Sequence, residues 1–208
     1  IPIVERTTEG VTERSVRPVQ WGRFLVSVFD EWLERDVGRA FVQIFEASLA
    51  SWMGLTPALC IFAETCGDAL ALEHNGDLYA CDHFVELEHR LGNIREAHML
   101  TLVASARQRA FGRNKRDSLP QFCRTCDVLF ACRGECPRNR FIQTPDGKPG
   151  LNYLCQGYKA YFRHIDVPMR ILASLVRRGE DPSAAYRILQ RAQRGERRRH
   201  RTKRRDRR

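Results

Sequence analysis

Apolar residues recur at helical spacing in the first part of the chain. They fall at i, i+3, i+4, i+7, i+8 and i+11, and are Trp21, Phe24, Leu25, Val28, Phe29 and Trp32. This spacing is typical of one buried helix face, and Pro18 suits the first turn, so we expect a helix over 18–35. Asp36-Val37-Gly38 breaks the pattern, and the apolar run at 39–45 then predicts a short buried strand. A helix followed by a strand is typical of the end of an α/β unit.

A tight hairpin is the clearest local signal further along the chain. The pair Asn75-Gly76 separates residues 69–74 from 77–81, and Asn-Gly is the preferred pair of a type I′ turn. We therefore predict a two-stranded hairpin here. The turn would bring Cys81 back towards Cys66, so that two thiols meet at one site.

The remaining elements are predicted mainly as helices and loops. Residues 91–94 indicate a turn that leads into a helix over about 96–110, and 112–121 indicate a polar loop. Residues 155–178 predict a helix that breaks at Pro168, with a second helix from about 169 to 178. A short helix at 182–192 should precede the end of the chain.

Charge is concentrated at the end of the chain. The 208 residues carry a net charge of +10, and 191–208 hold eleven Arg or Lys residues against two acidic ones, so the rest is near neutral. We expect this tail to be disordered and to bind nucleic acid, if at all, only nonspecifically. The whole chain is 43% hydrophobic, enough for a packed core, and no apolar run is long enough to span a membrane.

The first residues give no sign of export. Residues 1–17 contain acidic residues and lack the apolar stretch of a secretion signal, so we expect a cytoplasmic protein. The chain begins with Ile rather than Met, from which we expect a fragment or a processed product.

Cysteine is the most informative residue type. The eight cysteines are Cys60, Cys66, Cys81, Cys123, Cys126, Cys132, Cys136 and Cys155. A disulfide framework would require an oxidising compartment, and zinc sites favour paired CxxC motifs, of which this chain has one. Iron–sulfur clusters accept less regular spacing because their ligands converge from several loops, and eight thiolates suffice for two clusters.

The spacing resembles that of a known domain type. Cys66-x9-Gly76-x4-Cys81, then Cys123-x2-Cys126-x5-Cys132-x3-Cys136, then Cys155 match the pattern of the SPASM domain, the auxiliary-cluster domain of certain radical SAM enzymes. Three features narrow the resemblance to the anaerobic sulfatase-maturating family. They are Cys60, the string Cys81-Asp82-His83-Phe84 and the run Phe41 to Phe45.

The resemblance implies a fold and a domain division. Residues 1–58 would be the last helix–strand unit of a partial TIM-type radical SAM barrel, an α/β fragment. Residues 59–178 would form a small α+β SPASM domain with a β-hairpin and two cluster-binding loops, and 179–208 a basic tail. The family's radical cluster requires a Cx3Cx2C motif, which is absent here, so we expect the S-adenosylmethionine site and a third cluster only in a preceding part of a longer enzyme.

The resemblance also implies an activity. Members of the family oxidise a Cys or Ser of a sulfatase polypeptide to Cα-formylglycine, and take electrons from a donor such as flavodoxin or ferredoxin. Two auxiliary [4Fe–4S] clusters carry electrons. By position, the first would be held by Cys60, Cys66, Cys81 and Cys136, and the second by Cys123, Cys126, Cys132 and Cys155.

One residue beside these ligands has an implied catalytic role. Asp82 would be the general base that takes the proton of the target thiol or hydroxyl, and burial beside Phe84 would make it a stronger base. The alternative is a solvated or capping carboxylate beside Cys81. His83 is expected to be structural.

Two other classes of function remain open at this stage. The chain could belong to a SPASM-domain maturase of another peptide or protein. It could also be a non-catalytic iron–sulfur or zinc binding module.

Overall fold

Small sheets and helices make up the chain, an α+β arrangement. The computed structural model describes residues 2–8, 10–192 and 194–195. Its longer helices are α1 (Pro18–Arg35), α2 (Gln43–Trp52), α4 (Ala106–Asp117) and α7 (Cys155–Arg177). Short helices are α3 (Met99–Val103), α5 (Gln121–Arg124) and α6 (Leu129–Cys132), with 3-10 turns at Leu87–His89, Pro137–Asn139 and Pro182–Ala184. The described residues form no barrel, and none of their helices is long and apolar enough to cross a membrane.

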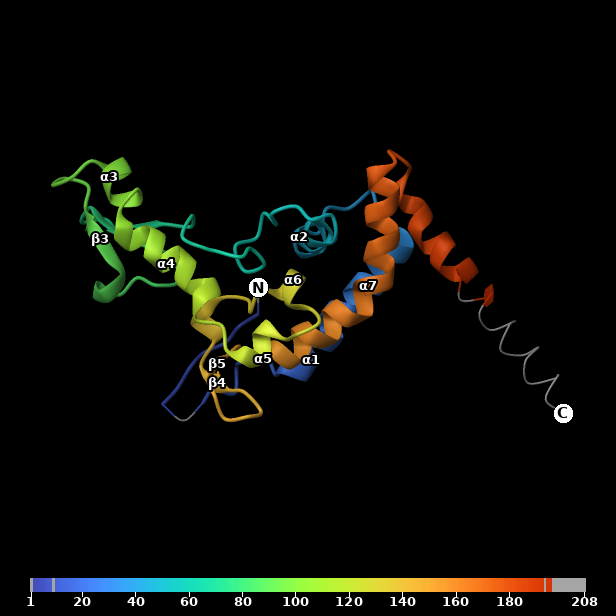
Figure 1. Ribbon diagram of the computed structural model, residues 1–208, viewed down its shortest axis with the longest axis horizontal. Helices are drawn as coiled ribbons and strands as arrows, with labels where there is room; N and C mark the ends of the chain where they lie inside the picture. Colours follow the sequence, from blue (N-terminus) through green and yellow to red (C-terminus); the bar gives the residue numbers. More distant parts are fainter. Residues whose placement is uncertain (1, 9, 193, 196–208) are drawn as a thin grey trace.

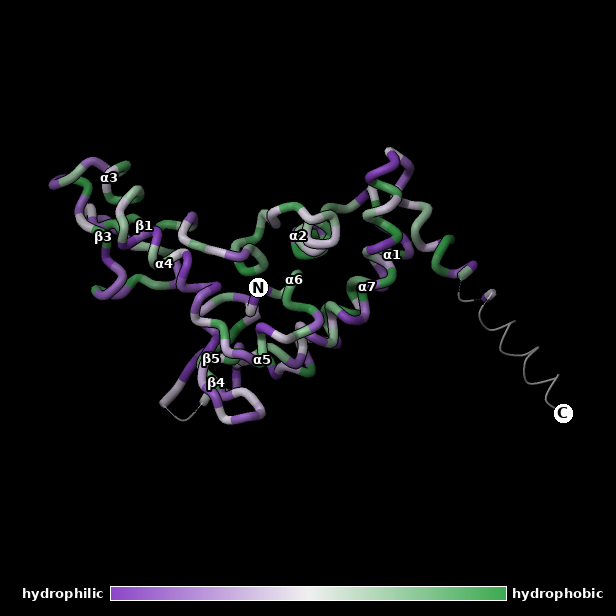
Figure 2. The backbone as a smooth tube through the Cα atoms, in the orientation of Figure 1, coloured by the Kyte–Doolittle hydropathy of each residue, from purple (hydrophilic) through white to green (hydrophobic). Residues whose placement is uncertain are grey.

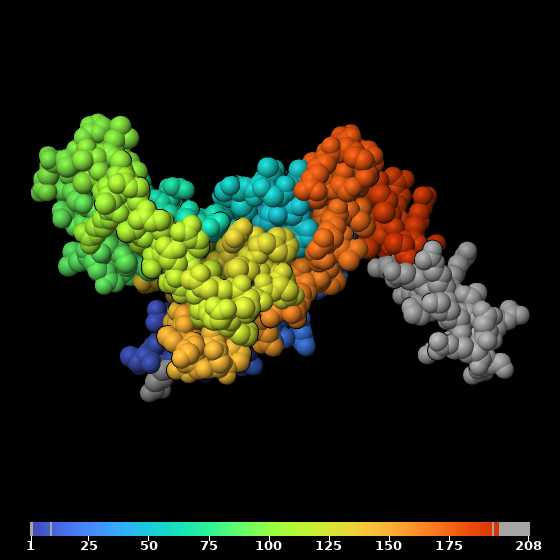
Figure 3. Space-filling model, in the orientation of Figure 1, coloured from blue at the N-terminus to red at the C-terminus, as the bar shows by residue number. Residues whose placement is uncertain are grey.

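Two antiparallel sheets complete the fold. The first has the order β1-β2-β3 and comprises Ala71–Leu72, Asp77–Tyr79 and Arg90–Asn93; the second pairs β4 (Ile142–Gln143) with β5 (Pro149–Leu151). Figure 1 shows an elongated molecule, with β3, α3 and α4 at one end and α1 and α7 towards the other. Figure 3 shows a hollow on the upper edge of the molecule, between α2 and the end that contains β3, α3 and α4.

The main core lies between α1, α2 and α7. Phe29, Phe45 and Tyr161 are almost fully buried there, and Phe29 makes edge-on ring contacts with the other two at 5.3 and 6.3 Å. Hydrophobic and hydrophilic positions alternate along both long helices (Figure 2), so each helix turns one apolar face inward. This core includes residues on both sides of the division expected at 58–59.

The predicted helix at 18–35 is confirmed, although its apolar face is only partly buried. Trp21 and Trp32 lie in the core, whereas Phe24 is 56% exposed and stacks on Trp21. The strand predicted at 39–45 is wrong, because the second half of this run begins α2. Ile44, Phe45, Ser48, Leu49 and Trp52 follow helical spacing, and the strand interpretation stopped before that periodicity became visible.

The predicted hairpin is confirmed, but its turn is of a different type. The loop has three residues, since the Glu73 N–H donates to the Asp77 carbonyl and the Gly76 N–H donates to the Glu73 carbonyl, both at 2.9 Å. Gly76 has a φ of +92°, whereas a type I′ turn also needs a positive φ at the residue before it. Among the described non-glycine residues, only Arg133 and Glu135 have positive φ.

The segment after the hairpin also differs from the prediction. Residues 90–93 form β3 rather than a turn, held against β2 by the Arg90–Asp77 ion pair at 2.6 Å. The helix predicted over 96–110 is divided, because the Ser105 hydroxyl caps a new helix by accepting from the Gln108 N–H. The second of these helices runs on to Asp117, into the predicted loop.

Helix α7 continues through Pro168, where we expected a break. Pro168 is buried within the helix, and Ile165, Met169 and Leu172 on the same face are at most 1% exposed. A proline inside a helix costs about 3 kcal/mol, which burial of several large side chains can offset. Figure 1 shows α7 bending along its length, as an internal proline favours.

The fold extends beyond residue 179, where we expected the tail to begin. Residues 185–192 are helical, in line with the short helix predicted at 182–192, and Ala185 is buried in the main core. Disorder was predicted for the basic end of the chain, and residues 193 and 196–208 of it lie outside the described residues.

Candidate functional site

The eight cysteines are free thiols. Electrostatic interactions between neighbouring thiols link them into two groups of four. In one group, burial and then the charge of the neighbouring Cys60 raise the pKa of Cys66. Burial and the charge of Cys136 likewise contribute to the raised pKa of Cys81. In the other, burial and then Cys155 and Cys123 raise the pKa of Cys132. We call Cys60, Cys66, Cys81 and Cys136 site I, and Cys123, Cys126, Cys132 and Cys155 site II.

Helix α4 holds the first two cysteines of site I. Gly112 accepts a hydrogen bond from the Cys66 N–H at 3.3 Å, and a Cβ on Gly112 would overlap the Cys66 carbonyl oxygen. The Lys115 ammonium donates to the carbonyls of Cys60, Ile61 and Ala63, the last two at 2.9 and 2.6 Å. The loop that carries Cys60 and Cys66 therefore lies directly on this helix.

The same helix joins the loop to the hairpin. The buried Gln108 side-chain amide donates to the carbonyls of Gly67 and Ala80, at 2.6 and 2.9 Å. Gly67 follows Cys66 and Ala80 precedes Cys81, so one amide fixes the distance between two cysteine-bearing segments. The hairpin thus returns Cys81 towards Cys66, as the sequence predicts, with Gln108 as the link.

Site II surrounds an apolar cavity. Its four thiols come from α5, the turn after α5, the end of α6 and the first residue of α7. All four line one partly open apolar cavity, together with Phe122, Val128, Leu129 and Leu151. Lys159 stands at the same cavity and acts electrostatically on Cys123 and Cys155.

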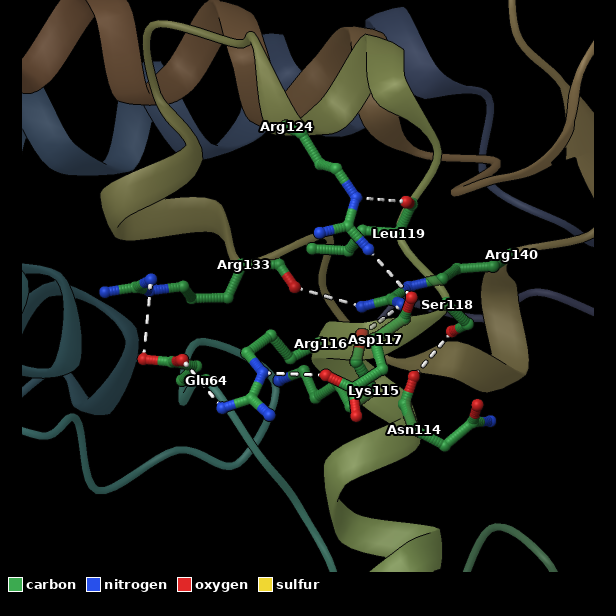
Figure 4. Close-up of polar contacts among 10 residues, drawn as sticks. All are labelled: Glu64, Asn114, Lys115, Arg116, Asp117, Ser118, Leu119, Arg124, Arg133 and Arg140. Carbon is green, nitrogen blue, oxygen red and sulfur yellow. Dashed lines mark hydrogen bonds and ion pairs between the residues drawn. The ribbon is translucent and has the colours of Figure 1, made fainter.

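A single short loop joins the two sites. Cys132 belongs to site II and Cys136 to site I, and Arg133, Gly134 and Glu135 between them all have left-handed φ, from +49° to +72°. The Arg140 guanidinium donates to the carbonyls of all three, at 2.8 to 3.1 Å. It also donates to the Lys115 carbonyl at 2.6 Å, and Figure 4 shows Arg140 reaching both Lys115 and Arg133.

Glu135 connects this loop to the start of α7. Its carboxylate accepts from the side-chain amides of Asn152 and Asn139, and burial raises the pKa of Glu135. The Asn152 side-chain oxygen in turn accepts from the Leu154 N–H at 2.8 Å, immediately before Cys155. These contacts set Cys155 relative to the loop that carries the other thiols.

The buried thiols are held protonated when no metal is bound. Burial raises the pKa of Cys81 and of Cys132 to about 12, and that of Cys136 and of Cys155 to about 11. A thiol binds metal as the thiolate, so loading must release these protons. Buried thiolates become stable only next to cationic charge, which a bound metal would supply.

The arrangement fits a cluster better than a single ion. Within the described chain, no three Cys, His, Asp or Glu side chains converge on one metal position. Four thiolates around zinc share one point about 2.3 Å away, whereas the four ligands of a [4Fe–4S] cluster each bind a different iron around a larger body. The four thiols of site II line one shared cavity rather than one metal position within the described chain.

Asp82 lies beside site I but is exposed. Its carboxylate accepts from the Cys81 thiol at 3.2 Å, and its backbone N–H donates to the Ala69 carbonyl at 2.8 Å. The burial expected from Phe84 is absent, because Phe84 instead packs against His89 and Phe111. His83 Nδ1 lies 3.5 Å from the Cys136 sulfur, so His83 spans two cysteines of site I.

Sequence reasoning missed the polar residues that support the thiols. Gln108, Gly112 and Lys115 fall at i, i+4 and i+7, one face of a helix, but this face is polar and was not recognised by a search for apolar periodicity. Arg140 gave no signal of its own in the sequence.

Comparison with known proteins agrees with this geometry. Residues 60–127 match SPASM, an iron-sulfur cluster-binding domain, and this range begins at Cys60. The serine-type anaerobic sulfatase-maturating enzyme of Bacteroides thetaiotaomicron is 52% identical over 163 residues. That of Klebsiella pneumoniae is 38% identical over 151 residues, and the cysteine-type enzyme of Clostridium perfringens is 28% identical over 158.

The chain is related to the anaerobic sulfatase-maturating enzymes. The matches cover 78% and 72% of this chain but only 39% and 36% of the Bacteroides and Klebsiella enzymes. Among solved structures, native anSMEcpe with bound AdoMet and Cp18Cys peptide superposes with a TM-score of 0.70 at 27% identity, covering 84% of this chain and 48% of that one. The resemblance inferred from the cysteine spacing is confirmed, over less than half the length of these relatives.

Proposed function

We propose that this chain is the auxiliary-cluster part of a sulfatase-maturating enzyme that oxidises a side chain of a sulfatase polypeptide to formylglycine. The observation that carries the proposal is the gathering of eight free thiols into two groups of four, with an apolar cavity at site II. The relatives' names supply the activity, and the solved complex of anSMEcpe with a peptide supports a polypeptide substrate. The cytoplasm, where thiols stay reduced, suits this chemistry.

In this proposal each site holds one [4Fe–4S] cluster with four thiolate ligands. When bound, such clusters carry single electrons, and full thiolate ligation leaves no open iron for substrate. The chain's own residues hold the thiols in place: Gly112 and Gln108 at site I, and Glu135 with Asn152 at site II. S-adenosylmethionine and the third cluster belong to the remaining length of the relatives, which a radical SAM barrel would occupy. Exposed Phe24 and Phe41 are apolar positions on which that part would pack.

Asp82 is the proposed general base. Oxidation of –CH2OH to –CHO removes two electrons and two protons: the 5′-deoxyadenosyl radical formed in the remaining part of the enzyme would take a hydrogen atom from the carbon, Asp82 the hydroxyl proton, and a cluster of this chain the second electron. An exposed carboxylate beside site I can receive that proton from a substrate side chain, which a buried one could not reach.

We further propose serine as the target residue. The serine-type relatives are 52% and 38% identical to this chain, whereas the cysteine-type relative is 28% identical. A small electron donor such as flavodoxin or ferredoxin would supply the reaction's reducing equivalents.

Two measurements test the proposal. Anaerobic reconstitution of this chain should yield about eight iron and eight sulfide per chain, and each of Cys66→Ala and Cys155→Ala should lose about half. Exchange of the matched 163 residues in the Bacteroides enzyme for those of this chain should preserve formylglycine formation on a serine peptide. Zinc in place of iron, or a chimera that holds its clusters but forms no formylglycine, would contradict it.

A further inference from the structure

Lys115 is a buried cation among backbone carbonyls. Its side chain is 1% exposed, and its ammonium has three N–H donors, which match its three described acceptors on Cys60, Ile61 and Ala63. None of these partners carries a charge. Burial away from water disfavours an ammonium, and a negative group close by favours its charged form.

The groups that can supply this negative charge are the thiols of site I. The charge of Lys115 acts on Cys60, Cys66 and Cys136, three of the four members of that site. Glu135 is the other acidic group that acts on Lys115, but its carboxylate is engaged by Asn152 and Asn139. Loaded with a cluster, site I would carry net negative charge directly beside the ammonium.

Arg140 has a different position. It donates to backbone carbonyls alone, and its charge acts on Cys66 and Cys136 of site I and on Cys123 and Cys132 of site II. Figure 4 shows its side chain directed towards the backbone of Lys115 and of Arg133. Arg140 therefore serves both sites, whereas Lys115 is specific to site I.

We propose that Lys115 is the internal counter-charge of site I, which makes the cluster there easier to reduce and holds the Cys60 loop in place. The inference rests on the proposed presence of a cluster at site I. Reduction adds one negative charge, and a fixed cation in a buried setting stabilises the reduced state more than the oxidised one. Lys115 is thus a positioning residue that acts through the ligands, without contact to substrate.

The test compares three variants of the reconstituted chain. Lys115→Gln keeps two N–H donors and removes the charge, Lys115→Arg keeps both charge and donors, and Lys148→Gln removes an exposed lysine on the loop between β4 and β5. Midpoint potentials come from reductive titrations followed by electron paramagnetic resonance. A Cys155→Ala background, which leaves only site I complete, assigns the signals.

Lys115→Gln should disfavour reduction of the site I cluster at least tenfold, which is about 59 mV for a one-electron couple, with a smaller effect on site II. Lys115→Arg and Lys148→Gln should leave site I near its original potential. Loss of half the iron in the Gln variant but not in the Arg variant would also support a charge role. Full iron with unchanged potentials in Lys115→Gln, or equal iron loss in the Gln and Arg variants, would overturn it. If the unmodified chain takes up no iron–sulfur cluster, the proposed function fails instead.

Discussion

Gly22 and Gly157 face each other where α1 crosses α7. A Cβ built on Gly22 would lie 2.8 Å from the Cα of Gly157, and one built on Gly157 would overlap the Pro18 carbonyl oxygen. The two backbones are thus in direct contact, and this contact lies two residues after Cys155. The close packing of α1 on α7 therefore also helps to fix the position of Cys155, a thiol of site II.

Gly157→Ala should force the two helices apart. Overpacking of a tight contact costs about 1–3 kcal/mol, even though Ala favours a helix more than Gly does. Urea unfolding followed by the fluorescence of Trp21 and Trp32 measures the loss. Gly195→Ala is the matched control, because Gly195 is helical with nothing near its Cβ position. Equal stability of the two variants would show that the helices can separate without cost.

Gly112→Ala should empty site I and spare site II. Its methyl group would displace the Cys66 carbonyl, while helix propensity alone would make the variant slightly more stable. We expect reconstituted iron to fall from about eight to about four per chain, with the remaining cluster assigned to site II. Arg113→Ala, an exposed change on the same helix, should retain all the iron. Full loading of Gly112→Ala would refute this role for the glycine.

The Asp77 carboxylate should stabilise the hairpin in a pH-dependent manner. Hydrogen bonds from Arg90 and then Asn93 lower the pKa of Asp77 below its ordinary value of 3.8. A lowered carboxyl pKa stabilises the fold above that ordinary value, and the stabilisation is lost as the pH falls through the lowered pKa. Asp77→Asn should therefore increase amide exchange across 71–93 at pH 7 but have little effect near pH 2.

Comparison of the two proteins at the same pH removes the intrinsic pH dependence of exchange. Glu34→Gln, which removes an exposed carboxylate on α1, should change exchange in this segment at neither pH. A constant difference between wild type and Asp77→Asn across the range would mean that the ion pair contributes nothing.

Asp82→Asn tests the proposed base within the chimeric enzyme. The amide has the shape of the carboxylate but cannot accept the proton, so cluster content and S-adenosylmethionine cleavage should persist while formylglycine formation falls by a factor of about 100 or more. A serine target should suffer more than a cysteine target, because a hydroxyl is far less acidic than a thiol. Normal product from this variant would return Asp82 to the role of a solvated carboxylate beside Cys81.

The parts of the fold that the sequence predicts are those in which local pattern and burial coincide. The α1 stripe and the Asn75-Gly76 hairpin are of this kind, and the cysteine spacing predicted the family resemblance, whereas the assignment of ligands to two clusters stays a prediction. The strand at 39–45 failed because a short apolar run fits either element until Ser48 and Trp52 extend the periodicity. Lys115 and Arg140 could not be found from the sequence, because their role depends on carbonyls brought together by distant segments.

The loop from Cys132 to Cys136 makes the two sites thermodynamically linked. Its three consecutive left-handed residues are unfavourable for Arg133 and Glu135, so the conformation depends on its partners, which are the Arg140 guanidinium and, in the proposed function, the clusters bound at its two ends. Binding of the first cluster includes most of the conformational-entropy cost of ordering this loop. The second cluster then binds at a lower free-energy cost. Under limiting iron, the population should divide between empty and doubly loaded chains, and half-assembled enzyme with a single electron carrier should be scarce.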